Sequence, residues 1–300
     1  MRAAPGIAIA AGVLAVALLS APPPRRAPRG PHQPPLLPRP ELLHALFAAQ
    51  QSMVADYYWV RTTEATGEAE TPEEYRDIYD YASLVADLDP NFAYLYVFAG
   101  AAIPVNLGRE HWVNTEESTR ILERGVQRFP RHVFMRILYA HNLTYFRKDY
   151  RAAADSLAET SRLPGAPRYL APLSARMYAH AGAFDAGRAM AESLAEATTD
   201  PELKALMRRR RDQMDLEEEL QKVDRAVAAF QARTGRRPFG IEELVVAGDL
   251  TRMPVDPLGG QISFDLKGRA TSSSTSGLRL KLFDPRGEKS YVGDPDLEGK

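Results

Sequence analysis

The sequence contains no cysteine among its 300 residues. This absence excludes a disulfide scaffold, cysteine-based metal sites, a thiol nucleophile and lipid attachment through an N-terminal cysteine. The formal net charge is only −1, which removes the bulk electrostatic argument for a nucleic-acid-binding protein. Nucleic acid is therefore not among the expected partners.

Catalytic motifs are also missing. The six histidines (His32, His44, His111, His132, His141 and His180) show no HExxH or HxH spacing. No Ser/His/Asp set, Walker loop or glycine-rich dinucleotide motif is present. Asp256 and Asp265 supply too few oxygens for calcium, so a structural turn is expected there. We predict no enzyme activity, no catalytic residues, no metal and no cofactor.

The N-terminus carries the longest apolar run. Residues 1–21 predict a signal peptide or membrane anchor, and residues 22–40 predict a stiff spacer rich in proline and arginine. Pro22 disfavours cleavage directly after Ala21, and the spacer arginines compete with Arg2 in setting orientation. The pattern favours an uncleaved anchor with an exported body; a cleaved export signal and an anchor with a cytoplasmic body are the alternatives.

The most informative positive feature is a pair of adjacent 34-residue units, residues 131–164 and 165–198. A shift of 34 aligns residues of matching character: Tyr139 with Leu173, Ala140 with Ser174, Leu143 with Met177, Tyr150 with Phe184, and Ala152 with Ala186. In each unit a small residue on a first helix is followed twelve positions later by alanine on a second helix, which allows two antiparallel helices to approach closely. A repeat of this length predicts a solenoid of helix pairs.

Proline spacing extends the repeat toward the N-terminus. Pro90, Pro130 and Pro164 each follow a predicted second helix, and the 40-residue interval from Pro90 to Pro130 exceeds the period by six. The six extra residues predict an insertion around residues 110–115, in the turn between two helices, where a longer loop lowers the stability of the fold only slightly. Further upstream, Thr71 and Pro72 predict a helix N-terminus.

The C-terminal third changes character. We predict helical repeats over 41–200, one long capping helix over 201–235, a small α+β tail over 236–285 and a disordered end over 286–300. An apolar stripe on the long helix predicts that this helix either caps the last helix pair or forms a coiled coil. The stripe consists of Leu216, Leu220, Val223, Val227 and Phe230. In the tail, residues 261–266 and 277–285 are the predicted strands, separated by a loop.

These patterns carry two resemblances. The units at 131–198, with residues 91–130 before them, resemble tetratricopeptide repeats, although the consensus tryptophan is missing. Three segments, YYWVRTTEATG, DLDPNFAYLYVFAG and SRLPGAPRYLAPLSARMYAHAG, resemble a group of bacterial membrane-anchored tetratricopeptide proteins. Residues 230–265 resemble the C-terminal half of type II secretion pseudopilins, in which a helix leads through a Gly-Arg-x-Pro turn to a Pro-x-Asp-Pro-x-Gly segment and a strand.

The tetratricopeptide resemblance implies a concave groove lined by the first helices. Polar and aromatic residues there are the candidate partner-binding residues: Tyr94, Asn142, Tyr145, Arg176, Tyr178 and His180. The tyrosines are equally compatible with a place in the core. Arg208–Arg211 favour a solvated, salt-bridged helix face, with Arg208 near Asp212 and Arg211 near Asp215, over a phosphate-binding patch.

The sequence thus predicts a mostly α protein, a tetratricopeptide-like solenoid with a small α+β appendage. We expect a non-enzymatic scaffold that binds a protein or peptide partner at the bacterial envelope and assists assembly of a secretion, pilus or surface-polysaccharide system. An inner-membrane anchor with a periplasmic body is expected, with a secreted or periplasmic cleaved form as the alternative. The alternative function is a structural subunit or adaptor whose pilin-like tail mediates self-assembly or docking to pilin-like subunits.

Overall fold

The computed structural model describes residues 32–109 and 111–280. The chain divides into two compact units, residues 1–35 and 36–300, and all the elements below belong to the second. The expected signal or anchor over 1–21, the first part of the spacer, residues 281–285 of the tail and the expected disordered end over 286–300 lie outside the described residues. None of the helices in the described part is long and apolar enough to cross a membrane.

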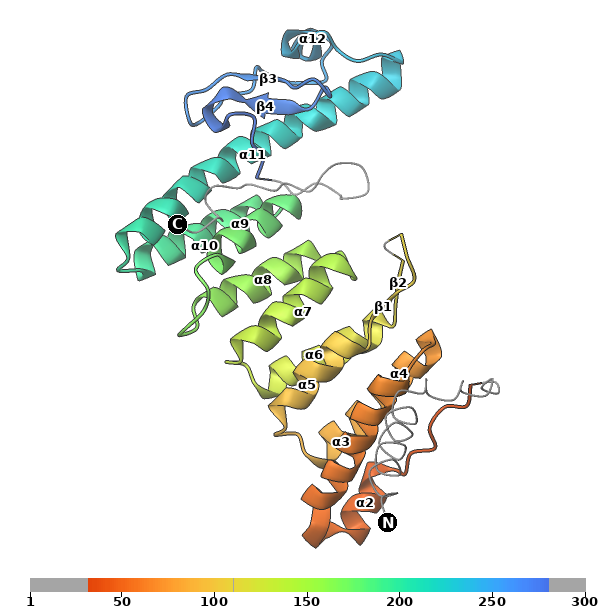
Figure 1. The fold of residues 1–300 in the computed structure, drawn as a ribbon. Helices are drawn as coiled ribbons and strands as arrows, with labels where there is room; N and C mark the ends of the chain where they lie inside the picture. Colours follow the sequence, from red (N-terminus) through yellow and green to blue (C-terminus); the bar gives the residue numbers. More distant parts are fainter. Residues whose placement is uncertain (1–31, 110, 281–300) are drawn as a thin grey trace, which may run out of the picture. The chain divides into compact units, whose positions relative to one another are not determined.

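The fold is mostly α, with helices packed in chain order (Figure 1). The helices up to α10 are α2 (Pro40–Leu46), α3 (Gln51–Glu68), α4 (Pro72–Leu88), α5 (Ala93–Ala102), α6 (Thr115–Arg128), α7 (Val133–Tyr145), α8 (Tyr150–Ser161), α9 (Leu170–His180) and α10 (Phe184–Ala197), with a 3-10 turn, η1 (Ala48–Gln50), between α2 and α3. Each helix from α3 to α10 contacts the next, in a repeat-like antiparallel arrangement. We call α3, α5, α7 and α9 the first helices, and α4, α6, α8 and α10 the second helices.

Helix ends form where the sequence supplies caps. The Thr71 hydroxyl accepts a hydrogen bond from the Glu74 amide, and the Glu74 carboxylate accepts one from the Thr71 amide, so α4 begins with a capping box. Pro72 occupies the first turn, where its missing N–H costs nothing. Asp149 caps α8 by accepting from the Ala152 amide. These local signals confirm the helix start predicted at Thr71.

The 34-residue shift maps the start of α8 at Tyr150 onto the start of α10 at Phe184. Close packing within the pairs depends on small residues. Gly100 of α5 is buried, and a Cβ there would lie 2.5 Å from Leu122 Cγ on α6. Ser118 of α6 donates to the Gly100 carbonyl at 2.6 Å, which fixes the same contact through a hydrogen bond.

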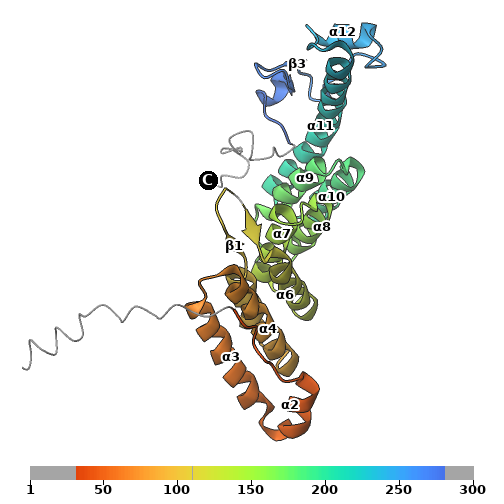
Figure 2. The same cartoon turned by 90° about the vertical axis from the view of Figure 1, so that its right-hand side faces the viewer.

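The longer turn predicted between two helices is a hairpin between α5 and α6. Strand β1 (Val105–Asn106) pairs antiparallel with β2 (Trp112–Val113). The hairpin extends beyond the ends of both helices (Figures 1 and 2). The Asn114 side chain donates to the Pro72 carbonyl at 2.7 Å, so the hairpin base is tied to the start of α4.

The two halves of helix α11 (Pro201–Thr234) pack against different parts of the chain. Its first half buries Met207 and Met214 against α9 and α10. The stripe predicted to cap the last helix pair or to form a coiled coil does neither: Leu216, Leu220, Val223 and Phe230 pack against α12 (Ile241–Val246) and the tail sheet. The helix is long enough to carry a second apolar segment past the last pair (Figure 2), and that segment is the core of the tail.

The small sheet also departs from the predicted pattern. Strand β3 (Ile262–Phe264) lies within the first predicted strand, but its partner is β4 (Ala270–Ser272), in the segment predicted to be loop. The prediction of a strand from residue 277 is wrong for residues 277–280. Asp265 accepts hydrogen bonds from the Lys267 and Arg269 amides and closes a tight turn, so pairing begins directly after it.

Residues 279–280 are fixed to α11 by a buried ion pair. Arg279 donates two hydrogen bonds to the Glu217 carboxylate, at 2.7 and 2.9 Å, and one to Asp224 at 2.9 Å. The side chains of Arg279 and Glu217 are only 3% and 1% exposed. Glu217 also accepts from the Leu280 amide, and Leu280 packs into the cluster that includes α9. The tail is therefore bound to the helical part at its far end as well as along α11.

Candidate functional site

Two aromatic clusters lie at the surface of the first helices. In the first cluster, Trp59 of α3 makes edge contacts with Tyr94 and Phe98 of α5, at ring-centroid distances of 5.9 and 5.1 Å. Phe92, directly before α5, contacts the same indole at 5.0 Å. Tyr94 is 60% exposed although it belongs to this cluster. Edge-to-face contacts fix the rings in place and leave apolar surface facing solvent.

The second cluster joins α7 to the hairpin. His141 stacks on Tyr145 at 4.5 Å and contacts the edge of Phe146 at 5.9 Å, and Phe146 lies 5.5 Å from Trp112 of β2. The Lys148 ammonium lies 5.9 Å from the Tyr145 ring centre, within cation–π range. His141 is partly exposed, yet partial burial of its imidazole lowers its pKa, because desolvation disfavours the imidazolium form.

A shift of 40 residues relates the two clusters, because it maps the start of α5 at Ala93 onto the start of α7 at Val133. The shift places Phe134, which is 55% exposed, at the position of Tyr94. On α7, residues 134, 138, 141 and 145 are spaced by three or four and share one side of the helix. We call the combined surface the aromatic face: Trp59, Tyr94, Phe98, Trp112, Phe134, Leu138, His141, Tyr145 and Phe146.

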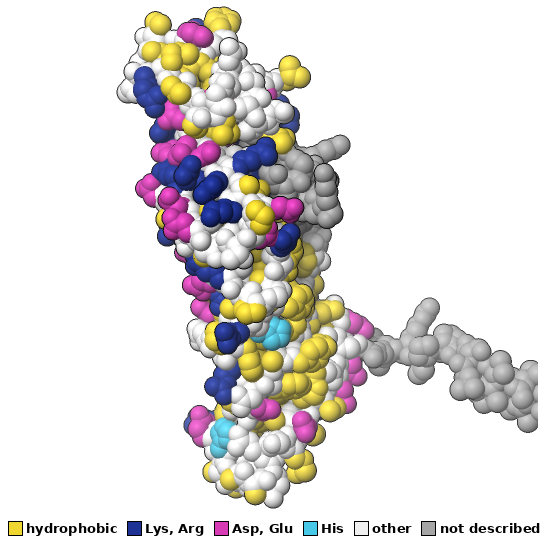
Figure 3. All heavy atoms as spheres, turned by 90° about the vertical axis from the view of Figure 1, so that its left-hand side faces the viewer, with side chains coloured by type: hydrophobic (Ala, Val, Ile, Leu, Met, Phe, Trp, Pro, Cys, Tyr) yellow, Lys and Arg dark blue, Asp and Glu magenta, His cyan; other side chains and the backbone are white. Residues whose placement is uncertain are grey.

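A space-filling view from the left-hand side of Figure 1 shows where hydrophobic side chains gather on that side (Figure 3). Hydrophobic side chains form a broad area at the height that α3 to α7 occupy in Figure 1, with charged side chains mostly at its edges. At the height of α10 and α11, Lys and Arg alternate with Asp and Glu instead. Large exposed apolar areas of this kind are typical of protein-interaction surfaces.

Two of the six predicted partner-binding residues, Tyr94 and Tyr145, lie on the aromatic face, and Tyr145 is 55% exposed. A third, Asn142, lies on the buried side of α7. It donates to Ser118 Oγ at 2.7 Å and Thr119 Oγ1 at 3.3 Å on α6. Asn142 thereby extends the Ser118–Gly100 hydrogen bond into a buried network that joins α5, α6 and α7.

Replacing Asn142 with alanine is expected to lower the free energy of unfolding by about 1–2 kcal/mol, because the buried Ser118 hydroxyl loses its donor. Urea denaturation followed by circular dichroism measures the change. A shift below about 0.5 kcal/mol would contradict a structural role for this network.

The three candidates on α9 are largely enclosed. Arg176 and Tyr178 are buried, and His180 is half-buried with its ring 3.9 Å from that of Tyr150. The Tyr178 hydroxyl donates to Asp155 at 2.5 Å; burial, reinforced by the Asp155 carboxylate, raises the pKa of this tyrosine. Helix α8 contributes to the enclosure through Asp155 and Tyr150, and α11 also packs on α9, where Gln221 donates to the Ala179 carbonyl at 3.0 Å. The partner-binding role of these residues stays a prediction.

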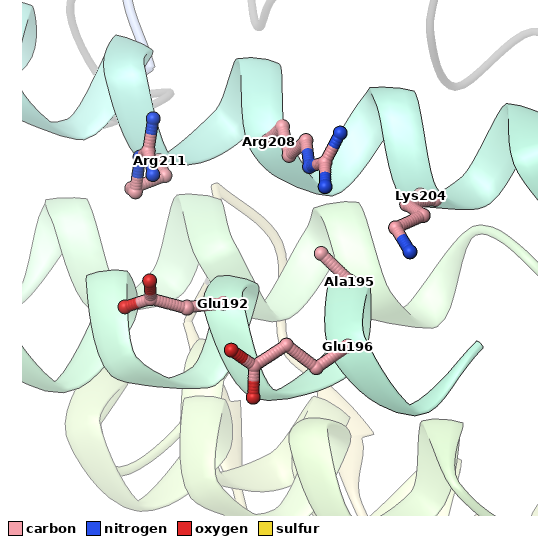
Figure 4. Close-up of a pocket in the computed structure, with 6 residues that line it drawn as sticks. All are labelled: Glu192, Ala195, Glu196, Lys204, Arg208 and Arg211. Carbon is pink, nitrogen blue, oxygen red and sulfur yellow. The ribbon is translucent and has the colours of Figure 1, made fainter.

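A polar pocket lies between α10 and α11 (Figure 4). Glu192, Ala195 and Glu196 face Lys204, Arg208 and Arg211 across it. The pairing predicted along α11 is different in part: Arg211 contacts its neighbour Asp212 at 2.8 Å, and Asp215 contacts Arg188 of α10 at 2.9 Å. Arg210 is buried and not on a solvated face. Carboxylates and cations together line the pocket, so it lacks the single sign of charge that an anion site requires.

The Asp256 loop is a structural turn. Burial opposes ionisation of Asp256, but hydrogen bonds from Ser272, Ser274 and two backbone amides outweigh that cost and lower its pKa. The Asp256 carboxylate is thus already engaged by donors of the chain itself. Within residues 32–109 and 111–280, no group of three or more His, Asp and Glu side chains is placed to hold a metal ion.

Sequence reasoning missed most of the aromatic face. Trp59, Phe98, Trp112 and Phe134 are large apolar residues, which pattern analysis assigns to the core. One signal was available, because the 40-residue interval between Pro90 and Pro130 also maps Tyr94 onto Phe134. The same 40-residue interval, applied to side chains as well as to helix ends, aligns the exposed aromatic residues Tyr94 and Phe134.

With this geometry established, comparison with models of known protein families gives no match, and no curated protein matches the chain either.

Proposed function

We propose that this chain is a non-enzymatic scaffold, a tetratricopeptide-like solenoid that binds a protein partner on its aromatic face. The observation that supports the proposal is the set of exposed aromatic side chains on α5 and α7, of which Tyr94 and Phe134 are related by the 40-residue interval. Aromatic side chains supply large contact area at low conformational cost and dominate the energetics of protein interfaces.

The proposal includes a place of action. The apolar run over 1–21 and the spacer over 22–40 support attachment to a bacterial inner membrane with the body in the periplasm, or export after cleavage. In that setting the scaffold assists assembly of a secretion, pilus or surface-polysaccharide system. The N-terminal segment provides the membrane contact, and the aromatic face provides the protein contact.

A second candidate function is favoured by the tail. Phe239 and Val246 are 90% and 89% exposed, and Leu266 is fully exposed. These side chains support a structural subunit or adaptor in which the pilin-like tail mediates self-assembly or docks to pilin-like subunits. Both candidates are protein-binding functions, and they differ in which surface makes the contact.

Site-specific photo-crosslinking in the cells that produce the chain separates the two. A photoreactive phenylalanine analogue is placed at Tyr94, Phe134 or Tyr145 of the full chain, with Phe239 and Val246 as matched exposed apolar controls. We expect one discrete protein to crosslink from all three positions of the aromatic face and from neither control. Crosslinks confined to the two tail positions would overturn the scaffold proposal in favour of the adaptor.

Deleting the whole tail is a poor test of the second candidate. Removing residues 236–300 would also remove Arg279 and leave the buried Glu217 carboxylate without its main partner. Val246→Asp changes the exposed tail surface without touching this pair, so it tests docking with the fold intact.

A further inference from the structure

Charge is distributed unevenly between first and second helices. The first helices α5, α7 and α9 contain no aspartate or glutamate, and α5 contains no charged residue at all. The second helices α4, α6, α8 and α10 each carry several carboxylates. Helices α5 and α7, which carry most of the aromatic face, thus bring no negative charge to it. Helix α3, which carries Trp59, does contain three carboxylates: Asp56, Glu64 and Glu68.

Cations without an ion pair adjoin the aromatic face. Arg131 is exposed two residues before the start of α7, Lys148 is exposed three residues after its end, and Arg109 is exposed between β1 and β2. Within the part of the chain that the structure describes, none of the three forms an ion pair, and the Lys148 ammonium lies over the Tyr145 ring. In contrast, the neighbouring Arg147 is neutralised by Glu116 at 2.8 Å, and Arg136 of α7 is bound to Glu159 of α8.

We infer that the occupant of the aromatic face is an acidic peptide segment with apolar anchors. Its aliphatic or aromatic side chains contact the exposed rings of α5 and α7, and its carboxylates face Arg131 and Lys148. This inference rests on the proposed function and adds to it the chemical class of the partner. Opposite charge at the rim of an apolar interface selects the partner and speeds encounter, while burial of the anchors holds the complex together.

The spacing of the exposed and half-buried side chains on α5 and α7 suits a helical segment. Tyr94 and Phe98 on α5, and Phe134, Leu138, His141 and Tyr145 on α7, follow intervals of three and four on two helices that contact each other. A partner helix with anchors at the same intervals can place them against both rows. An acidic amphipathic helix is therefore the appropriate probe.

Two labelled peptides test the inference by fluorescence anisotropy with the full chain in mild detergent. Both are designed amphipathic helices with identical leucine positions, and their polar positions carry glutamate in one and lysine in the other. At an ionic strength of about 0.05 M we expect the glutamate peptide to bind roughly tenfold more tightly, and the preference to shrink at about 0.5 M as salt screens the charges.

Charge reversal identifies the residues responsible. The double variant Lys148→Glu, Arg131→Glu is expected to abolish the preference, while the control Arg225→Glu, at an exposed position on α11, leaves it unchanged. Equal affinity for the two peptides, a preference for lysine, no binding of either peptide, or an unaltered preference in the double variant would overturn the inference. The photo-crosslinks from Tyr94, Phe134 and Tyr145 report separately on whether the face binds a partner at all.

Discussion

Replacing Arg279 with methionine is expected to lower the free energy of unfolding by about 3–5 kcal/mol. The change leaves the Glu217 carboxylate buried without its cation, at a position where that side chain is 1% exposed. The hydrogen bond from Arg279 to the Ala270 carbonyl of β4, at 2.7 Å, is lost at the same time. Guanidinium denaturation of the full chain in mild detergent, followed by circular dichroism, measures the effect.

Two matched variants show whether burial causes this effect. Arg236→Met removes an ion pair with Glu243 at the surface, and is expected to cost much less stability than Arg279→Met, because solvent screens an exposed pair. The double variant Arg279→Met, Glu217→Met leaves no unpaired charge at this site and should recover part of the lost stability, although the Ala270 carbonyl and the Leu280 amide lose their partners. A single Arg279 variant no less stable than the Arg236 variant would contradict the argument.

Replacing Gly125 with valine is expected to cost about 2–3 kcal/mol through overpacking. A Cβ at this position would lie 2.6 Å from Met135 Sδ on α7 and 2.7 Å from Tyr96 Cβ on α5. The Tyr96 Cβ belongs to a fully buried side chain and has no space to move. The contacts therefore force α6 away from both of its neighbours, and the same denaturation measurement detects the loss.

Gly67→Ala is the matched control, because Gly67 lies within α3 and an added Cβ meets nothing within 4 Å. Here alanine is expected to stabilise the chain by about 0.5–1 kcal/mol, as its backbone loses less entropy on entering a helix. Opposite signs at the two glycines would show that close packing governs Gly125. An unchanged denaturation midpoint for Gly125→Val would contradict the claim that close packing excludes a side chain at this position.

Much of the helical fold was predictable because its signals are local. Prolines end the second helices, Thr71 with Glu74 starts α4, and the 34-residue shift locates the starts of α8 and α10. The shift fails for the first helices: it maps the start of α7 onto residue 167, whereas α9 begins at Leu170. Gly165 adopts a φ of 77° beside Pro164, and this turn delays the start of α9.

The tail was harder to predict because its partners are distant in sequence. The stripe from Leu216 to Phe230 has the spacing of a capping or coiled-coil helix, and spacing alone does not reveal which apolar surface will cover it. The ion pair between Glu217 and Arg279 joins residues 62 positions apart. The turn at Asp265 that positions β4 is, in contrast, local, since the carboxylate accepts from the Lys267 and Arg269 amides, and this signal was overlooked.

In the candidate site, too, the sequence predicted some features and missed those that depend on contacts between distant segments. The resemblance placed the partner-binding residues on the first helices, and Tyr94 and Tyr145 are indeed exposed there. Arg176 and Tyr178 sit on a first helix too, but α11 packs on α9 and they are buried. Which first helices remain open depends on where the long helix docks, and that is a tertiary property with no local sequence signal.

The hairpin between α5 and α6 has a consequence for how the chain unfolds. Its base is bonded to the start of α4 through Asn114, and Trp112 contacts Phe146 at the end of α7, so one connector touches the helix pairs on both sides. In a linear array, neighbour interfaces decide whether units open one at a time or together. Such bridging contacts couple α4 to α7 into one cooperative block, and amide protons across these helices should share a single opening free energy.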